Sequence, residues 1–163
     1  MPIVYILIGV QGAGKSAWAR LNAERLNAAI LASDEMRNEL EAQGIDAATE
    51  GDRVFAMVEQ RLGQLVDSDR NVIVDATHAR RRWRAKHLGI ARKHGARTVA
   101  VWFDLPLAVC LARNAAKPGG LRWGERVVPE AILRDVARGF EPPGDGEFDE
   151  VWRMTVEGSV TTI

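Results

Sequence analysis

Eight residues near the beginning of the chain combine glycines with a lysine and a serine at a spacing that suits phosphate binding. The segment Gly9–Ser16 reads GVQGAGKS and fits the pattern G-x-x-x-x-G-K-[ST] of a phosphate-binding loop, or P-loop. Glycines adopt backbone angles that other residues avoid, so the N–H groups of such a loop can point into one concavity. Lys15 can then reach the β- and γ-phosphates of a nucleotide, and the Ser16 hydroxyl can bind Mg²⁺. The residues expected to surround the phosphates are Gly9, Gln11, Gly12, Ala13, Gly14, Lys15, Ser16 and Ala17.

The sequence on either side of this loop predicts the strand and the helix that a P-loop requires. The apolar run Ile3–Ile8 is typical of a buried parallel strand. A helical pattern over Ala17–Ala28 follows the loop, and the amino end of that helix would add a positive dipole beside the phosphates. The alternative interpretation is a glycine-rich turn between a strand and a helix, with a lysine present by chance.

Two carboxylates follow two further predicted strands. Short apolar stretches at 29–32 and 71–74 predict strands that end just before Asp34 and Asp75. Parallel strands place their carboxyl ends at one edge of a sheet, so both carboxylates are expected beside the P-loop. Transfer of a phosphoryl group to a hydroxyl needs one carboxylate to accept the proton and another near Mg²⁺. We therefore predict Asp34 as the general base and Asp75 as an indirect Mg²⁺ partner, although either acid could simply favour a helix start or a turn.

Several basic residues could bind phosphate groups around this site. Arg37 lies three residues beyond Asp34 on the same helical face and could bind an anion of the acceptor. Arg113 and Lys117 precede a glycine-rich loop, and they could fold over the γ-phosphate as part of a mobile lid at about 113–128. The alternatives are an exposed helix arginine at 37 and, for the other two, cations that favour a helix carboxyl end. Further candidate lid cations are Arg122 and Arg126.

The whole chain reads as one α/β domain, residues 1–163, because its alternating strands and helices predict a parallel sheet covered on both faces, and the motif at 9–16 indicates a P-loop NTPase. We expect a kinase-like three-layer fold with a parallel sheet of about five strands. The single cysteine, Cys110, excludes an internal disulfide, and it is expected to be a small buried apolar group. No apolar run approaches the length of a membrane span, and Met1-Pro2 leads directly into the first strand, so a cytoplasmic enzyme is expected.

The net charge of zero hides a strongly basic section. Residues 76–103 contain no acid and eight basic residues, which are Arg80, Arg81, Arg82, Arg84, Lys86, Arg92, Lys93 and Arg97. A nucleic-acid backbone would suit this section, and a solvated basic helix without a ligand is an equal alternative. Trp83 is expected in the core. His78 is expected to cap a helix start, with a contact to substrate as the other possibility.

These segments together resemble the P-loop polynucleotide 5′-kinases, and the resemblance extends over about residues 3–154. It rests on the order of IGVQGAGKS, SDEMR at 33–37, VIVDATH, FDLP, and the final VPEAILRDVARGFEPP. The resemblance implies transfer of the γ-phosphate of ATP or another nucleoside triphosphate to a 5′-hydroxyl of DNA or RNA, with Mg²⁺. It also implies that Arg37 binds the neighbouring phosphate of the acceptor and that Arg113 is the first lid arginine.

Two departures from this family pattern concern the acceptor and the lid. The family often has Asp-x-Thr-Asn where this chain has Asp75-Ala76-Thr77-His78, and Lys117 stands where a second lid arginine is usual. The alternatives to a polynucleotide kinase are a small-molecule kinase of the gluconate, shikimate or antibiotic-modifying type, and a nucleotide-binding switch or toxin-like protein. The basic section and the FEPP ending favour the polynucleotide kinase.

Overall fold

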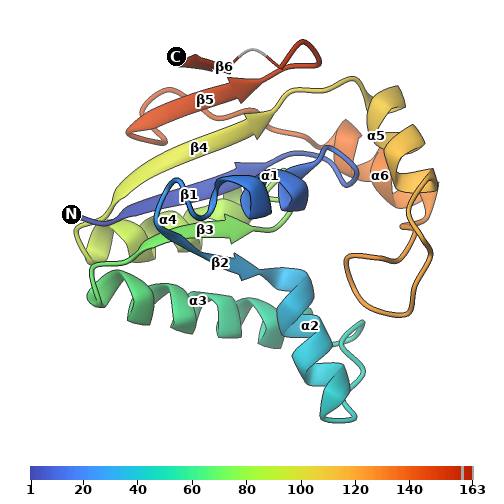
Figure 1. Cartoon of the computed structure of the whole chain (residues 1–163), viewed down its shortest axis with the longest axis horizontal. Coiled ribbons are helices and arrows are strands. Elements are labelled where there is room, and N and C mark those ends of the chain that lie inside the picture. The colour runs from blue at the N-terminus through green and yellow to red at the C-terminus, as the bar shows by residue number, and fades with distance from the viewer. Residues whose placement is uncertain (159, 163) are drawn as a thin grey trace.

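The computed structural model describes residues 1–158 and 160–162, and it places a twisted sheet between two layers of helices (Figure 1). Six strands pair within this part of the chain, in the spatial order β2-β3-β1-β4-β5-β6. The first five run parallel, and β6 pairs antiparallel with β5. The strands are β1 (Ile3–Ile8), β2 (Ala28–Ala32), β3 (Asn71–Asp75), β4 (Arg97–Phe103), β5 (Glu150–Met154) and β6 (Val160–Thr162).

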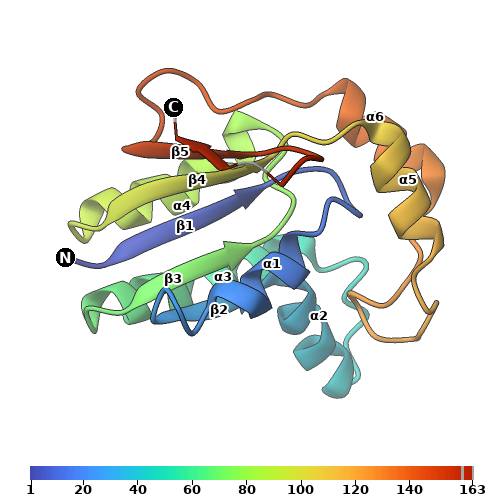
Figure 2. The same cartoon turned by 45° about the horizontal axis from the view of Figure 1, so that its top comes forward.

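The helices cover both faces of this sheet (Figure 2). One face packs against α2, α3 and α4, and the other against α1 and α5. The helices of the described residues are α1 (Lys15–Asn22), α2 (Ser33–Ala42), α3 (Gly51–Asp67), α4 (Arg81–Lys93), α5 (Leu107–Ala115) and α6 (Glu130–Arg138).

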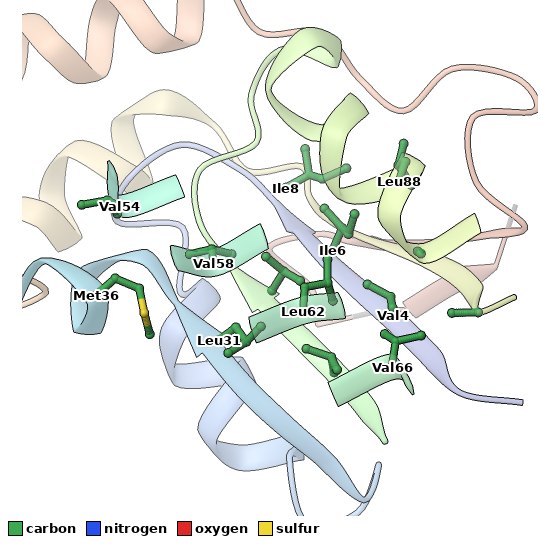
Figure 3. Close-up of a cluster of buried hydrophobic side chains, with 14 of the residues drawn as sticks. Val4, Ile6, Ile8, Leu31, Met36, Val54, Val58, Leu62, Val66 and Leu88 are labelled. Atoms are coloured by element: carbon green, nitrogen blue, oxygen red, sulfur yellow. The ribbon is translucent and has the colours of Figure 1, made fainter. Parts of the chain in front are cut away.

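The central strand β1 is apolar throughout because it is buried on both faces. Val4, Ile6 and Ile8 pack on the side of α3, while Tyr5 and Leu7 pack on the side of α1 and α5. Four residues of α3 at helical spacing complete the first of these clusters (Figure 3), and they are Val54, Val58, Leu62 and Val66. The rigid core therefore fixes the end of β1, from which the glycine-rich loop begins.

The carboxyl ends of β1, β2 and β3 lie at one edge of the sheet. Ala32 at the end of β2 is in register with Asp75 at the end of β3. Ile6 of β1 is in register with Val74, so β1 ends beside Asp75 as well. The sheet thus brings three separate chain segments, each carrying candidate site residues, to the same edge.

The predicted α/β fold of the P-loop kinase type is confirmed, with several differences in detail. The antiparallel strand β6 extends the expected sheet of about five strands to six. Helix α1 ends at Asn22 rather than at Ala28, because the chain turns before β2 with Asn27 at a φ of 47°. The prediction that Trp83 lies in the core is wrong: its side chain is 39% exposed, because α4 turns the face with Arg84 and Leu88 inward instead.

Among the described residues, no helix is both long enough and apolar enough to cross a membrane.

Candidate active site

The glycine-rich loop closes on the side chain of Lys15. Its Nζ donates hydrogen bonds to the carbonyl oxygens of Gly9, at 2.9 Å, and Val10, at 3.0 Å. Only 8% of Lys15 is exposed. Burial lowers the pKa of Lys15 to about 8, and the nearby carboxylates of Asp75 and Asp34 partly oppose that change. The ammonium group therefore lies at the centre of the loop, within electrostatic reach of both predicted acids.

The loop backbone admits only glycine at one position. Gly12 has a φ of +85°, and a Cβ atom there would lie 2.3 Å from the carbonyl oxygen of Cys110 in α5. The helix α5 therefore packs directly against the loop, and the buried Cys110 is part of that contact, as expected for a small apolar residue. Gln11 lies in the same turn, and its side-chain oxygen is buried without a hydrogen-bond donor among the described residues.

Ser16 and Asp75 meet at the beginning of α1. The Ser16 hydroxyl donates to Oδ2 of Asp75 over 2.6 Å. Asp75 is 7% exposed, and burial raises its pKa, while the Ser16 hydrogen bond and the charge of Lys15 act in the opposite direction. Hydroxyl and carboxylate oxygens are ligands that Mg²⁺ accepts, so the pair fits a magnesium site completed by phosphate and water oxygens. No cluster of three or more His, Cys, Asp or Glu side chains suited to a metal occurs in residues 1–158 and 160–162.

Asp34 and Arg37 form a pair in the first turns of α2. Their nearest charged atoms, Oδ1 and Nη1, are 3.6 Å apart, and the side chains are 42% and 19% exposed. Burial lowers the pKa of Arg37, opposed by the charge of Asp34. The charge of Asp34 also acts to raise the pKa values of Lys15 and Asp75. This contribution is smaller than that of burial and of several other groups. The structure thus places Asp34 near the loop, on the edge predicted from the sequence.

The lid segment rests on α2 through Trp123, which sequence reasoning did not single out. The Trp123 backbone N–H donates to Oδ1 of Asn38 at 2.8 Å, and its indole N–H donates to Oε1 of Glu41 at 2.7 Å. The guanidinium of Arg37 lies 5.0 Å from the Trp123 ring centre and 6.0 Å from that of Phe55. The helical spacing of 34, 37, 38 and 41 puts the two lid partners on the face that carries Asp34 and Arg37, which is the only sequence signal for them.

The candidate lid cations divide into two groups. Nη1 of Arg113 donates to the carbonyl oxygen of Ala13 at 3.1 Å, so this arginine lies at the glycine-rich loop. The charge of Lys117 contributes to the lowered pKa of Lys15, behind the larger effect of burial. Arg122 and Arg126 instead pair with acids of α2, at 3.3 Å to Glu35 and 2.8 Å to Glu41. Arg113 therefore lies at the loop, Lys117 lies within electrostatic range of Lys15, and the other two connect the segment at 122–126 to α2.

His78 is turned into the interior rather than toward a substrate. Its Nδ1 lies 2.9 Å from the Leu7 carbonyl oxygen, and its Nε2 lies 2.9 Å from Nδ1 of His87. Because a carbonyl only accepts, Nδ1 of His78 carries a hydrogen, and His87 then donates to Nε2. Burial lowers the pKa of His78 to about 3 and that of His87 to about 4, so both rings are neutral. The pair therefore connects α4 to the carboxyl end of β1.

The family comparison agrees with this architecture. The chain matches the protein family described as an AAA domain over residues 4–143, and it belongs to that family. No curated protein shows significant sequence similarity to the chain.

Solved structures give the fold more specifically. A candidate kinase from Chloroflexus aurantiacus has a TM-score of 0.76 at 14% identity, over 94% of this chain and 88% of that one. The APS kinase CysC of Mycobacterium tuberculosis, in complex with AMPPNP and APS, has a TM-score of 0.66 at 20% identity, over 97% and 90%. A chain of the Pnkp1/Rnl/Hen1 RNA repair complex has a TM-score of 0.71 at 24% identity, over 85% of this chain but only 43% of its own length. Together these likenesses show the P-loop kinase fold.

Proposed function

We propose that this protein is an ATP-dependent polynucleotide 5′-kinase, which transfers the γ-phosphate to a 5′-hydroxyl of DNA or RNA. The observation that carries the proposal is the position of Asp34 and Arg37 on the sheet edge that also holds Lys15. A carboxylate that accepts a proton and an arginine that binds a phosphate suit an acceptor whose hydroxyl lies next to a phosphodiester.

In the proposed reaction, Asp34 accepts the proton of the acceptor hydroxyl as its oxygen attacks the γ-phosphorus. The bond from that phosphorus to the bridging oxygen of the nucleoside diphosphate breaks, and the diphosphate leaves. Lys15 and Arg113 stabilise the negative charge on the phosphate oxygens. Ser16 would bind Mg²⁺ and Asp75 would hold it indirectly, and the ion would screen the charge of the bound phosphates.

The polynucleotide acceptor is favoured over a small molecule by basic residues at the same edge of the fold. The loop after β3 leads into Arg80, Arg81 and Arg82 at the start of α4. A similar P-loop domain occurs in a chain of an RNA repair complex, although that chain is more than twice as long as the matched part. A long polyanion would gain affinity from these arginines, whereas a small acceptor inside the site would not reach them.

The lid favours a second candidate, a small-molecule kinase. Trp123 and Gly124 lie against Arg37 and Asp34, which would enclose a small acceptor between lid and α2. The APS kinase similar in fold shares nearly its full length with this chain.

An acceptor panel separates the two candidates. The protein is incubated with ATP labelled in its γ-phosphate, Mg²⁺, and 5′-hydroxyl oligonucleotides of DNA and RNA, or a set of sugars and nucleosides. We expect labelled oligonucleotides, and no label on the same oligonucleotides with a blocked 5′ end. Label on small molecules alone would reject the polynucleotide proposal. Asp34→Asn is the matched inactive protein, and Glu24→Gln, which changes an exposed acid outside the proposed site, is the active control.

A further inference from the structure

Four arginines at the ends of two helices line one cavity outside the site described above. The cavity has a volume of about 610 Å³, and it lies between the first turn of α4 and the last turn of α6. Glu141 is the only acid among its seven lining residues, which are Arg80, Arg81, Arg82, Arg138, Gly139, Phe140 and Glu141. A hollow with this excess of guanidinium groups attracts anions.

Two glycines of the segment after α6 leave room for the ends of two of these arginines. A Cβ atom on Gly139 would lie 2.0 Å from Nη2 of Arg80, so the guanidinium occupies the space that only a glycine leaves open. A Cβ atom on Gly144 would lie 2.6 Å from Nη2 of Arg81 in the same way. The segment after α6 therefore packs against the ends of two arginine side chains from the start of α4.

The acids around the cavity leave much of its positive charge unopposed. Glu141 accepts a hydrogen bond from the Arg81 backbone N–H at 3.0 Å, and so caps the helix. Glu147 is bound mainly by the buried Arg84, and it lies 3.9 Å from Arg81. Arg138 pairs with Asp135 on its own helix, where both side chains are mostly exposed to solvent. Ion pairs that are so exposed add little stability, so a phosphate can displace them at low cost.

The backbone connects this cavity to the glycine-rich loop. The Gly9 N–H donates to the Thr77 carbonyl oxygen at 3.2 Å, and the Glu141 N–H donates to the Ala79 carbonyl oxygen at 2.8 Å. The loop after β3 therefore contacts both the glycine-rich loop and the wall of the cavity. The chain from Thr77 to Arg80 spans at most about 11 Å. The loop after β3 begins at the sheet edge where β1 ends, and it leads from there to the arginines of the cavity.

We infer that this arginine cavity binds the sugar-phosphate backbone of the acceptor strand, a few nucleotides from its reacting end. The inference rests on the proposed function, because the strand in the cavity is the acceptor. Phe140 in the cavity wall offers an apolar surface beside the phosphates. Binding there would add affinity for long acceptors without contributing to the chemistry of transfer.

The test compares variants in the binding of a single-stranded oligonucleotide labelled at its 3′ end, followed by fluorescence anisotropy over a range of salt concentrations. The double variant Arg82→Ala/Arg138→Ala removes two exposed cavity charges. We expect affinity to fall about tenfold or more at low salt, and the slope of log K against log salt to become shallower by about 1.4 for two lost phosphate contacts. The Gly139→Ala variant displaces Arg80 without removing a charge. It should weaken oligonucleotide binding less than the double variant does.

The matched control is Lys93→Ala, an exposed cation in the last turn of the same helix, about 18 Å along its axis from Arg81. Equal affinity and equal salt slope in the double variant and this control would overturn the inference. Tripolyphosphate is tested in parallel, and a loss of affinity for tripolyphosphate alone would identify a free polyphosphate as the ligand and also overturn it. A different outcome would reject the proposed function instead. In that case the wild type would bind the oligonucleotide through the cavity but would transfer no phosphate to a 5′-hydroxyl.

Discussion

Gly124 lies against the carboxylate of Asp34: a Cβ atom at position 124 would be 3.6 Å from Oδ2 of that aspartate. The backbone of Gly124 has a φ of +91°, which a glycine adopts without strain. Because 42% of the Asp34 side chain remains exposed, the lid narrows the approach to this acid without closing it. The segment around Gly124 and the proposed general base therefore border the same space.

The lid contact predicts that Glu41 holds the lid on α2. Glu41→Ala removes the partner of the Trp123 indole and of Arg126, so residues 121–126 should leave α2 more often. We expect faster hydrogen exchange in this segment, with the exchange of β1 and β3 unchanged. Glu39→Ala is the matched control, since Glu39 pairs with Arg61 on α3. Identical exchange of the lid segment in the two variants would show that Glu41 does not hold it.

The proposed role of Asp34 predicts a separation of binding from transfer. Asp34→Asn keeps the size of the side chain but removes its capacity to accept a proton. Transfer to a hydroxyl should fall about 10²-fold or more, while the affinity for ATP changes little. Single-turnover transfer and equilibrium nucleotide binding measure the two quantities. Transfer at the normal rate by the Asp34→Asn variant would exclude Asp34 as the base.

The lowered pKa of Lys15 predicts proton uptake when a nucleotide binds. With a pKa of about 8, close to half of the Lys15 side chains are neutral at pH 8, and bound phosphates favour the charged form. ATP binding should therefore take up a fraction of a proton at pH 8 and a smaller fraction at pH 7. Calorimetry in two buffers of different ionisation enthalpy measures this number. Equal binding enthalpies in both buffers at pH 8 would contradict the prediction.

The buried ion pair of Arg84 and Glu147 predicts a large effect on stability. Arg84 is fully buried and donates to both Glu147 oxygens, at 2.6 and 2.9 Å, and to three carbonyl oxygens, those of His78, Glu141 and Pro142. Arg84→Met leaves these acceptors unpaired, so the free energy of unfolding should fall by about 3–5 kcal/mol in urea titrations.

Two further variants test whether the loss of stability comes from the buried ion pair. Arg97→Ala breaks an exposed pair with Glu150 and should cost less than about 1 kcal/mol. Adding Glu147→Leu to Arg84→Met removes the unpaired carboxylate and should restore part of the loss. A loss of less than about 1 kcal/mol for Arg84→Met alone would contradict the prediction.

Local patterns in the sequence were sufficient to predict most strands and helices and the edge of the sheet at which the candidate site lies. The apolar run of β1, the glycines of the loop and the acids after β2 and β3 are each defined within a few residues, because strand burial and tight turns impose their own residue types. The fold was therefore predictable, and so was the placing of Asp34 and Asp75 on the edge next to Lys15.

Only the tertiary structure decided which distant residues meet. The indole of Trp123 donates to Glu41 across 82 positions, and Arg84 reaches Glu147 across 63. Nothing in the local sequence selects such partners, since any exposed acid could serve and the choice depends on how the helices pack. For the same reason Trp83 was wrongly expected in the core. The sequence determined which residue types lie at the glycine-rich loop, and the packing of α2, α4 and α6 determined the contact of Trp123 with α2 and the arginine cavity.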